Sequence, residues 1–336
     1  MVIKLIEDKE MWDTFIDQSN DGLLFHKWDF LKIIEKHTSC KLLPYGIYNG
    51  DNLICLFPVF LKNYNGLKII FSPPPNTGVN RLGFIMNKEF YSLKQNKKET
   101  YLNIVAENFD KEIENISPNL LFICLVPNFL DIREFQWNNY KIDTNFLYTT
   151  NLNQSIDEIW NGFKKELRNQ IKQVDILNYK LLMSNDISTF YEMETELFRE
   201  KGMEFPVINK EYLEDIFSAY PENLKLYFLY DNYNNIVSTE MDCNYKDLYM
   251  LWIGGSKPSK IRYEEYLMWE LIKIAKNSGC KKLDWAGGPD KSIFKFKSKF
   301  NPDLDTCFIM RKQDNLGNLV TCANNIAKKI GICFNV

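Results

Sequence analysis

Apolar residues recur at intervals of three and four from position 156 to position 174, which predicts an amphipathic helix in the second half of the chain. Ser155 stands three residues before Glu158, in the pattern of a capping box at the start of this helix. The same half contains three further predicted helices, at 187–200, 210–219 and 261–278. Gly279 is expected to end the last of them, because glycine readily takes the left-handed conformation that closes a helix.

Short apolar runs bounded by turn residues alternate with the helices and predict strands. The clearest turn is Asn49-Gly50, which joins the runs 42–48 and 53–61 into a hairpin. The other strands are expected at 67–71, 120–126, 146–150, 181–183, 224–230, 236–243, 248–253, 282–285 and 306–311. The helices of the first half are expected at 11–39, with a break near 20–22, and at 99–116.

The two halves show a similar order of elements, namely helix, strand meander, helix and strand. A chain of 336 residues is also long enough for two domains. We therefore expect a mixed α/β (α+β) protein in which each domain has a mixed central sheet flanked by helices. The domains are expected at 1–150 and 151–312, followed by a polar tail at 313–336.

Composition narrows the function classes. The net charge of −3 gives no support for a DNA-binding protein. The N-terminus lacks the apolar core of a signal peptide, and no apolar run approaches the roughly 18 residues that span a bilayer, so we expect a cytoplasmic protein without a transmembrane segment. The eight cysteines form no C-x-x-C pair and there are only two histidines, which favours buried free thiols and no metal site.

A glycine pair precedes the helix at 261–278. Gly254-Gly255 and the residues up to Lys260 follow the strand at 248–253. A glycine-containing loop at a helix N-terminus offers free backbone N–H groups to a pyrophosphate or a developing oxyanion. The same residues also fit a plain strand-to-helix turn with Ser259 as the N-cap, and the sequence leaves both interpretations open.

The most specific signature lies between Glu265 and Phe300. It consists of a helix that ends in A-x-x-x-G, a strand with Asp followed by Gly-Gly, and an F-K-x-x-F segment: Ala275, Gly279, Asp284, Gly287-Gly288 and Phe296-Lys297-x-x-Phe300. This order resembles the C-terminal signature of the Fem-type aminoacyl and acyl transferases, which belong to the GNAT-fold superfamily. Asn301 stands where a glycine usually follows that segment. The resemblance implies two tandem GNAT-like domains.

Two other segments are similar to the same family. Residues 163–172 resemble its basic helix, in which Lys164, Arg168 and Lys172 are four residues apart; Arg168 is expected either to contact substrate or to lie on a solvated helix face. In the first half, the residues around Trp28 resemble the family's entry helix, and the strand hairpin and the proline-rich loop follow it. The resemblance places Trp28 and the loop Pro75–Arg81 at the acceptor cleft, where Arg81 would meet an anionic group; the same residues also fit a plain surface loop.

The resemblance implies transfer of an acyl or aminoacyl group to an amine, whose proton a carboxylate can accept. Glu240 and Asp242 are the candidate bases, because strand alternation points both to one face. Asp284 is a third candidate base or substrate contact, or else fixes the loop after its strand. Lys297 matches the family's loop lysine and is expected to contact substrate or donor. Tyr263 is expected to donate a proton to the leaving group.

Donor and acceptor follow from the resemblance alone. Residues 257–262 lack the R/Q-x-x-G-x-G/A pattern of ordinary acetyl-CoA enzymes, which counts against an ordinary acetyl-CoA pocket and favours an aminoacyl-tRNA or an unusual acyl donor. The co-substrate is therefore expected to be aminoacyl-tRNA or acyl-CoA, with no tightly bound cofactor. The expected acceptor is a cell-envelope precursor of peptidoglycan or polysaccharide, such as a UDP-linked muropeptide or an amino sugar. The alternatives are an acyl-CoA-dependent N-acyltransferase acting on an amino sugar and a non-catalytic GNAT-like binding protein.

Overall fold

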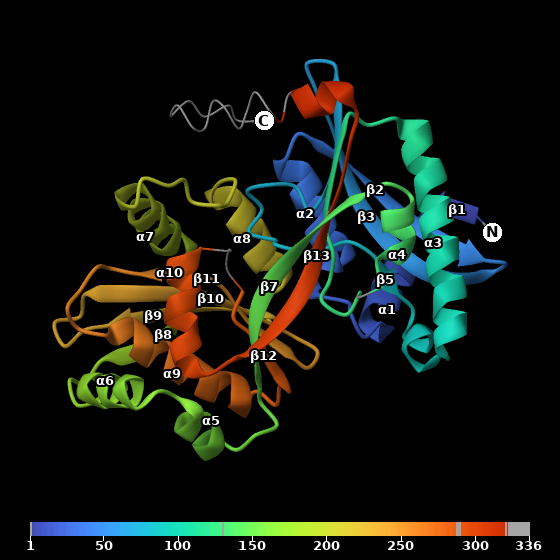
Figure 1. Ribbon diagram of the computed structural model, residues 1–336. Coiled ribbons are helices and arrows are strands. Elements are labelled where there is room, and N and C mark those ends of the chain that lie inside the picture. The colour runs from blue at the N-terminus through green and yellow to red at the C-terminus, as the bar shows by residue number, and fades with distance from the viewer. Residues whose placement is uncertain (1, 130, 287–289, 320, 322–336) are drawn as a thin grey trace. The chain divides into compact units, whose positions relative to one another are not determined.

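A computed structural model describes residues 2–129, 131–286, 290–319 and 321 (Figure 1). The chain divides into two compact units, which are described separately. Unit 1 comprises Met1–Asn145 and Cys307–Val336, and unit 2 comprises Phe146–Thr306. The sequence places residues 306–312 in the second domain, whereas the structure pairs Ile309–Gln313 with a strand of unit 1.

Unit 1 contains the strand order β1-β2-β3-β4-β6-β13, with β5 beside β3. Its strands are β1 Val2–Leu5, β2 Cys40–Asn49, β3 Asn52–Tyr64, β4 Leu67–Ser72, β5 Ile85–Met86, β6 Leu120–Cys124 and the C-terminal part of β13 Asp303–Gln313. Its helices are α1 Lys9–Gln18, η1 Leu24–His26, α2 Trp28–His37, η2 Lys88–Ser92, α3 Gln95–Ile116 and α4 Arg133–Trp137. The pairing of β4 with β6 is parallel and that of β2 with β3 is antiparallel, so the sheet is mixed.

Unit 2 contains the order β7-β12-β11-β10-β9-β8. Its strands are the end of β7 Lys141–Asn151, β8 Lys180–Ser184, β9 Leu224–Tyr230, β10 Ile236–Tyr245, β11 Leu248–Ser256 and β12 Lys282–Asp284. Its helices are α5 Ile156–Gly162, α6 Lys165–Asp175, α7 Ile187–Glu200, α8 Lys210–Ala219, α9 Tyr263–Asn277, α10 Lys291–Lys297 and η3 Ser298–Phe300. The pairing of β11 with β12 is parallel, whereas β12 with β7, β11 with β10, β10 with β9 and β9 with β8 pair antiparallel.

Local signals fixed several elements of unit 2. The predicted bounds of α7, α8 and β9 agree residue for residue with the structure. The capping box also forms: the Glu158 N–H donates to Ser155 Oγ at 3.2 Å, and the Ser155 N–H donates to Glu158 Oε2 at 2.7 Å. Gly279 follows the end of α9 with a φ of +82°, the left-handed conformation that closes the helix.

The predicted helix at 156–174 is in fact two helices. The chain turns between Gly162 and Lys165, where Phe163 and Lys164 have extended backbone. Both helices bury their apolar residues on one side. The spacing of three and four therefore continues from α5 into α6, and the sequence pattern does not show the break. A second correction concerns the basic segment at 290–300, which the sequence treats as a loop and which forms α10 and η3.

A hydrophobic core lies between the sheet of unit 2 and helices α5, α6 and α9. Leu167 of α6, Leu271 of α9 and Leu283 of β12 are members, and each is no more than 1% exposed. Burial of such side chains contributes about 1.5–3 kcal/mol each, which fixes α9 and β12 relative to each other. The six cysteines of the described residues are free, as predicted, while Cys322 and Cys333 lie outside those residues.

No helix among the described residues combines the length and the apolar character needed to cross a bilayer. Of the predicted tail at 313–336, Gln313 ends β13, residues 314–319 and 321 are also described, and the rest lies outside the described residues.

Candidate functional site

Strands β11 and β12 of unit 2 part after a short parallel pairing. β12 pairs with Leu248–Met250, and β11 continues to Ser256 with β10 as its partner. Among the described residues, no β12 residue pairs with the stretch Leu251–Ser256. This end of the β11–β12 pairing, called the opening between β11 and β12, leaves the rest of β11 without a β12 partner, and the charged side chains of Glu240, Asp242 and Lys297 lie near it.

Glu240 and Asp242 lie two residues apart on β10 beside the opening, so strand alternation gives their side chains the same face. Asp242 is fully buried and Glu240 is 7% exposed. The Tyr249 hydroxyl donates a hydrogen bond of 2.7 Å to Asp242 Oδ2, while Asp242 Oδ1 has no partner among the described residues. Burial raises the pKa of both carboxyl groups well above the usual range, and the charge of Asp242 raises the pKa of Glu240 further.

Lys297, the last residue of α10, contributes an amino group to the site. Its Nζ donates to the carbonyl oxygens of Trp285 and Ala286, each at 2.6 Å, and so lies at the C-terminal end of β12. Burial lowers the pKa of Lys297 to about 8, against the opposing effects of Glu240 and Asp284. An amine with a pKa near neutrality can carry its proton in one step of a reaction and release it in another.

Asp284 occupies the end of β12 and is 1% exposed. Its Oδ1 accepts a hydrogen bond of 2.8 Å from the Ala286 N–H, and Ala286 has a φ of +40°. This contact holds the turn that presents the two carbonyl oxygens to Lys297. Of the roles that the sequence left open for Asp284, the structure supports the one in which it fixes the loop after its strand.

The glycine pair does not form a loop at a helix N-terminus, which corrects one interpretation of the sequence. Gly254 and Gly255 belong to β11 and pair with Glu240 and Thr239. The N-cap of α9 is Arg262, so the alternative role for Ser259 as N-cap is also wrong. A Cβ atom on Gly254 would collide with the Glu240 carboxyl group, so glycine here makes room for a buried acid.

Glu194 is a site residue that the sequence analysis missed. It comes from α7, is fully buried, and accepts a hydrogen bond of 2.5 Å from Thr239 Oγ1. A Cβ atom on Gly255 would lie 2.8 Å from Glu194 Oε2, so the second glycine admits this second carboxyl group. The signal was present, because Glu194 interrupts the apolar stripe formed by Phe190 and Leu197.

Two predicted residues of unit 2 are engaged in local contacts. Arg168 Nη1 donates at 3.0 Å to the carbonyl oxygen of Asn161 and so ties α6 to the end of α5. The Tyr263 hydroxyl donates to the carbonyl oxygen of Lys257 and holds the segment that leads into α9. Glu264, which follows Tyr263, is exposed, whereas Glu265 beside it is buried and pairs with Lys299 at 2.9 Å (Oε1 to Nζ).

Trp28 and Arg81 belong to unit 1, and the structure describes them within that unit. Trp28 begins α2, where its N–H donates to Asp13 Oδ1 at 2.8 Å and its ring packs edge-on against Trp12. Arg81 is 4% exposed and its Nη1 lies 3.5 Å from Asn80 Oδ1. Their predicted contact with the acceptor stays a prediction.

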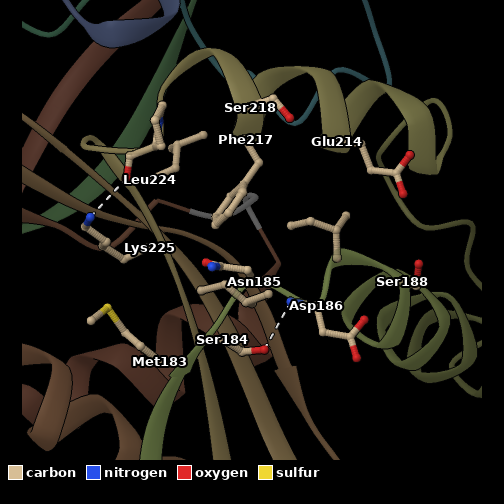
Figure 2. Close-up of a pocket in the computed structure, with 13 residues that line it drawn as sticks. Met183, Ser184, Asn185, Asp186, Ser188, Glu214, Phe217, Ser218, Leu224 and Lys225 are labelled. Carbon is tan, nitrogen blue, oxygen red and sulfur yellow. Dashed lines mark hydrogen bonds between the residues drawn. The ribbon is translucent and has the colours of Figure 1, made fainter.

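A large pocket of unit 2 lies away from these residues. It has a volume of about 800 Å³ and is lined by β8, β9 and the facing ends of α7 and α8 (Figure 2). The charged side chains along it have partners of their own: Asp186 caps α7, Lys225 Nζ donates to the Pro221 carbonyl oxygen, and Glu214 lies 3.7 Å from Lys210. None of the predicted site residues lines it.

Comparison with known proteins supports the fold prediction. Residues 162–298 match the family model described as an acetyltransferase (GNAT) domain. No curated protein matches the chain in sequence.

Three solved structures show the same fold. The structure titled FemX shares 12% identity with a TM-score of 0.69, over 92% of this chain and 97% of that chain. L-PGS from Bacillus licheniformis shares 11% identity with a TM-score of 0.58, over 94% and 96%. A tandem GNAT protein from the clavulanic acid biosynthesis pathway shares 7% identity with a TM-score of 0.55, over 93% and 98%. The predicted α/β class with tandem GNAT-like domains is confirmed, and so is the resemblance to Fem-type proteins at the level of fold.

Proposed function

Starting from this GNAT fold, we propose that the protein transfers an acyl or aminoacyl group from an activated donor to a primary amine at the opening between β11 and β12. The observation that carries the proposal is the buried carboxyl group of Glu240 together with the partly buried ammonium group of Lys297, whose charge lowers the pKa of Glu240. The matched acyltransferase domain and the transferase neighbours support the same reaction class.

Glu240 acts as the proton acceptor in this proposal. The amine nitrogen forms a bond to the acyl carbon, and the bond from that carbon to the donor's oxygen or sulfur breaks, which leaves its electron pair on that atom. The amine proton passes to the Glu240 carboxylate and from there to the leaving oxygen or sulfur. Burial of Glu240 raises the pKa of its carboxyl group, and this makes the carboxylate a stronger base once it is ionised. Asp242 raises the pKa of Glu240 further by its charge.

Lys297 stabilises the negative charge that gathers on the carbonyl oxygen. Its two carbonyl partners at 2.6 Å leave one of the three ammonium hydrogens to point elsewhere. A preorganised donor of this kind acts most strongly where water is excluded. The partly buried position of Lys297 therefore suits charge stabilisation better than a solvated lysine would.

The donor is proposed to be an aminoacyl-tRNA. The first turn of α9 carries Glu264 and Glu265, and carboxylates at a helix N-terminus disfavour a bound pyrophosphate such as that of CoA. The acceptor is proposed to be a cell-envelope precursor, such as a UDP-linked muropeptide or an amino sugar, in line with the FemX and L-PGS neighbours.

An acyl-CoA donor is the second candidate, because the family that matches residues 162–298 is described as an acetyltransferase domain. Mass spectrometry of each acceptor after incubation with charged tRNAs or with acyl-CoAs separates the two donors. Mass gain with tRNA alone supports the first candidate, and mass gain with acyl-CoA alone supports the second. Absence of mass gain with any pair, together with a thermal shift on addition of one of the acceptors or donors, favours a non-catalytic binding protein.

A further inference from the structure

Glu194 is a buried acid that the proposed reaction leaves without a role. Thr239 Oγ1 donates to its Oε1 at 2.5 Å, and Oε2 has no well-formed hydrogen bond among the described residues. A buried oxygen without a hydrogen-bond donor costs about 1–3 kcal/mol of folding free energy, and more if it is charged. Such an arrangement calls for a functional explanation.

The surroundings of Glu194 disfavour its negative charge. Burial is the largest effect and raises the pKa of Glu194 to about 7. Glu264 of α9 raises this pKa, while Lys201 after α7 and the hydrogen-bonding groups of Thr239 and Gly255 lower it. The Glu194 carboxyl group therefore exchanges its proton near neutral pH.

Glu194 and Glu240 approach the β10–β11 ladder from opposite faces. Thr239 contacts Glu194 and is followed directly by Glu240, and successive strand residues point to opposite faces. The two glycines of β11 repeat this arrangement, since Gly255 faces Glu194 and Gly254 faces Glu240. Because glycine has no side chain, little more than backbone separates the two acids, and the charge of Glu194 raises the pKa of Glu240.

We propose that Glu194 is a positioning residue of the transfer site, which holds Thr239 and Gly255 in place and controls by its own charge how readily Glu240 loses its proton. This inference rests on the proposed function, because it takes Glu240 as the proton acceptor. A neutral Glu194 eases ionisation of Glu240, whereas a charged Glu194 opposes it.

Thermal unfolding of the full chain tests the charge coupling without any substrate. Glu194 binds its proton more tightly in the folded than in the unfolded protein, so its contribution to stability is fully present below the unfolded pKa and is lost as pH rises through the folded pKa of about 7. Glu194→Gln removes this loss. The Tm of the variant minus that of the wild type is therefore expected to become more positive between about pH 5 and pH 8.

Two further variants sharpen this measurement. Glu196→Gln, at an exposed position of the same helix, is the matched control and is expected to leave the pH dependence unchanged. In a Glu240→Gln background the effect of Glu194→Gln is expected to shrink, because one of the two repelling charges is absent. A Tm difference that stays constant with pH, or that is equally large in both backgrounds, overturns the proposal.

The pH profile of kcat/KM supplies the functional test once a substrate pair is known. Glu194→Gln is expected to move the acid limb to lower pH and to raise the ratio of kcat/KM at about pH 6 to that at about pH 8 several-fold. Glu194→Asp keeps a carboxyl group and is expected to restore the wild-type limb in part. An acid limb that stays in place, with only kcat reduced, shows a merely structural role and overturns the proposal.

The unfolding measurement and the kinetic measurement distinguish failure of this inference from failure of the proposed function. If the wild type transfers nothing to any acceptor, the proposed function fails, while the unfolding measurement still decides whether Glu194 and Glu240 are coupled.

Discussion

Unit 2 contains two regions that compete for the role of functional site. The pocket between β8, β9, α7 and α8 has a volume of about 800 Å³ (Figure 2), but its charged side chains already contact backbone groups or, for Glu214, Lys210. The opening between β11 and β12 presents the buried acids Glu240 and Asp242 and the partly buried amine of Lys297 instead. Charged groups that already have partners at the surface have little need of a ligand. Burial of ionisable groups costs folding free energy, and groups with shifted pKa values are frequent at functional sites. We therefore place the chemistry at the opening.

The sharpest test of this comparison is Glu240→Gln, for which we expect the largest effect. The amide has nearly the same shape but cannot accept the amine proton, so kcat/KM is expected to fall by about 10²–10⁴-fold. The measurement is initial-rate transfer to the amine acceptor, with circular dichroism to verify the fold. If Glu214→Gln in the pocket reduces the rate as much as Glu240→Gln does, the site has been placed in the wrong region.

Lys297→Met is expected to have the next largest effect. The substitution keeps most of the side-chain volume but removes the donor to the developing oxyanion, so kcat is expected to fall by about 10²–10³-fold with a smaller change in KM. Lys295→Met, in the same helix α10, is the control and is expected to stay near the wild-type rate. A variant that loses affinity for the substrates but keeps kcat would show that Lys297 binds without stabilising the transition state.

Gly255→Ala tests whether the glycine pair exists to admit the acids. The new Cβ atom would lie 2.8 Å from Glu194 Oε2 and 3.0 Å from Leu197 Cδ1, so the free energy of unfolding is expected to fall by about 1–3 kcal/mol. Urea denaturation measures this loss. Because the closest contact is the acid itself, Glu194→Ala combined with Gly255→Ala is expected to cost less than the sum of the two single changes. Strict additivity would contradict the packing explanation.

The same glycines show where reasoning from sequence stops. The bounds of α7 and α8 follow from the helical period and from side-chain caps, Asp186 and Asn209, which are local signals. Gly254 and Gly255 are conformationally permissive in a loop and in a strand alike. Only the pairing of β11 with β10 decides between the two, because the hairpin continues past Ile253 and places both glycines opposite Thr239 and Glu240.

The residues of the candidate site, like the elements of the fold, were predictable only where a local pattern marks them. Glu240 and Asp242 share a face by simple alternation, and Lys297 stands out through the family resemblance. Glu194 lies more than 40 positions from Thr239, its hydrogen-bond donor, so no local pattern links them. The break between α5 and α6 was hidden for a different physical reason, because both helices bury their apolar side and the hydrophobic period continues across it.

Substitutions in the pocket are expected to have the smallest effect on kcat/KM and on stability. Lys225→Met and Glu214→Gln remove charges whose present partners are a backbone carbonyl and an exposed lysine. Exposed pairs contribute about 0–1 kcal/mol, so both variants are expected to unfold near the wild-type midpoint and to keep kcat/KM within about twofold. Parallel kinetics and urea denaturation measure both quantities. A large rise in KM with unchanged stability would instead make the pocket a substrate subsite, and the reaction at the β11–β12 opening would then draw on both regions.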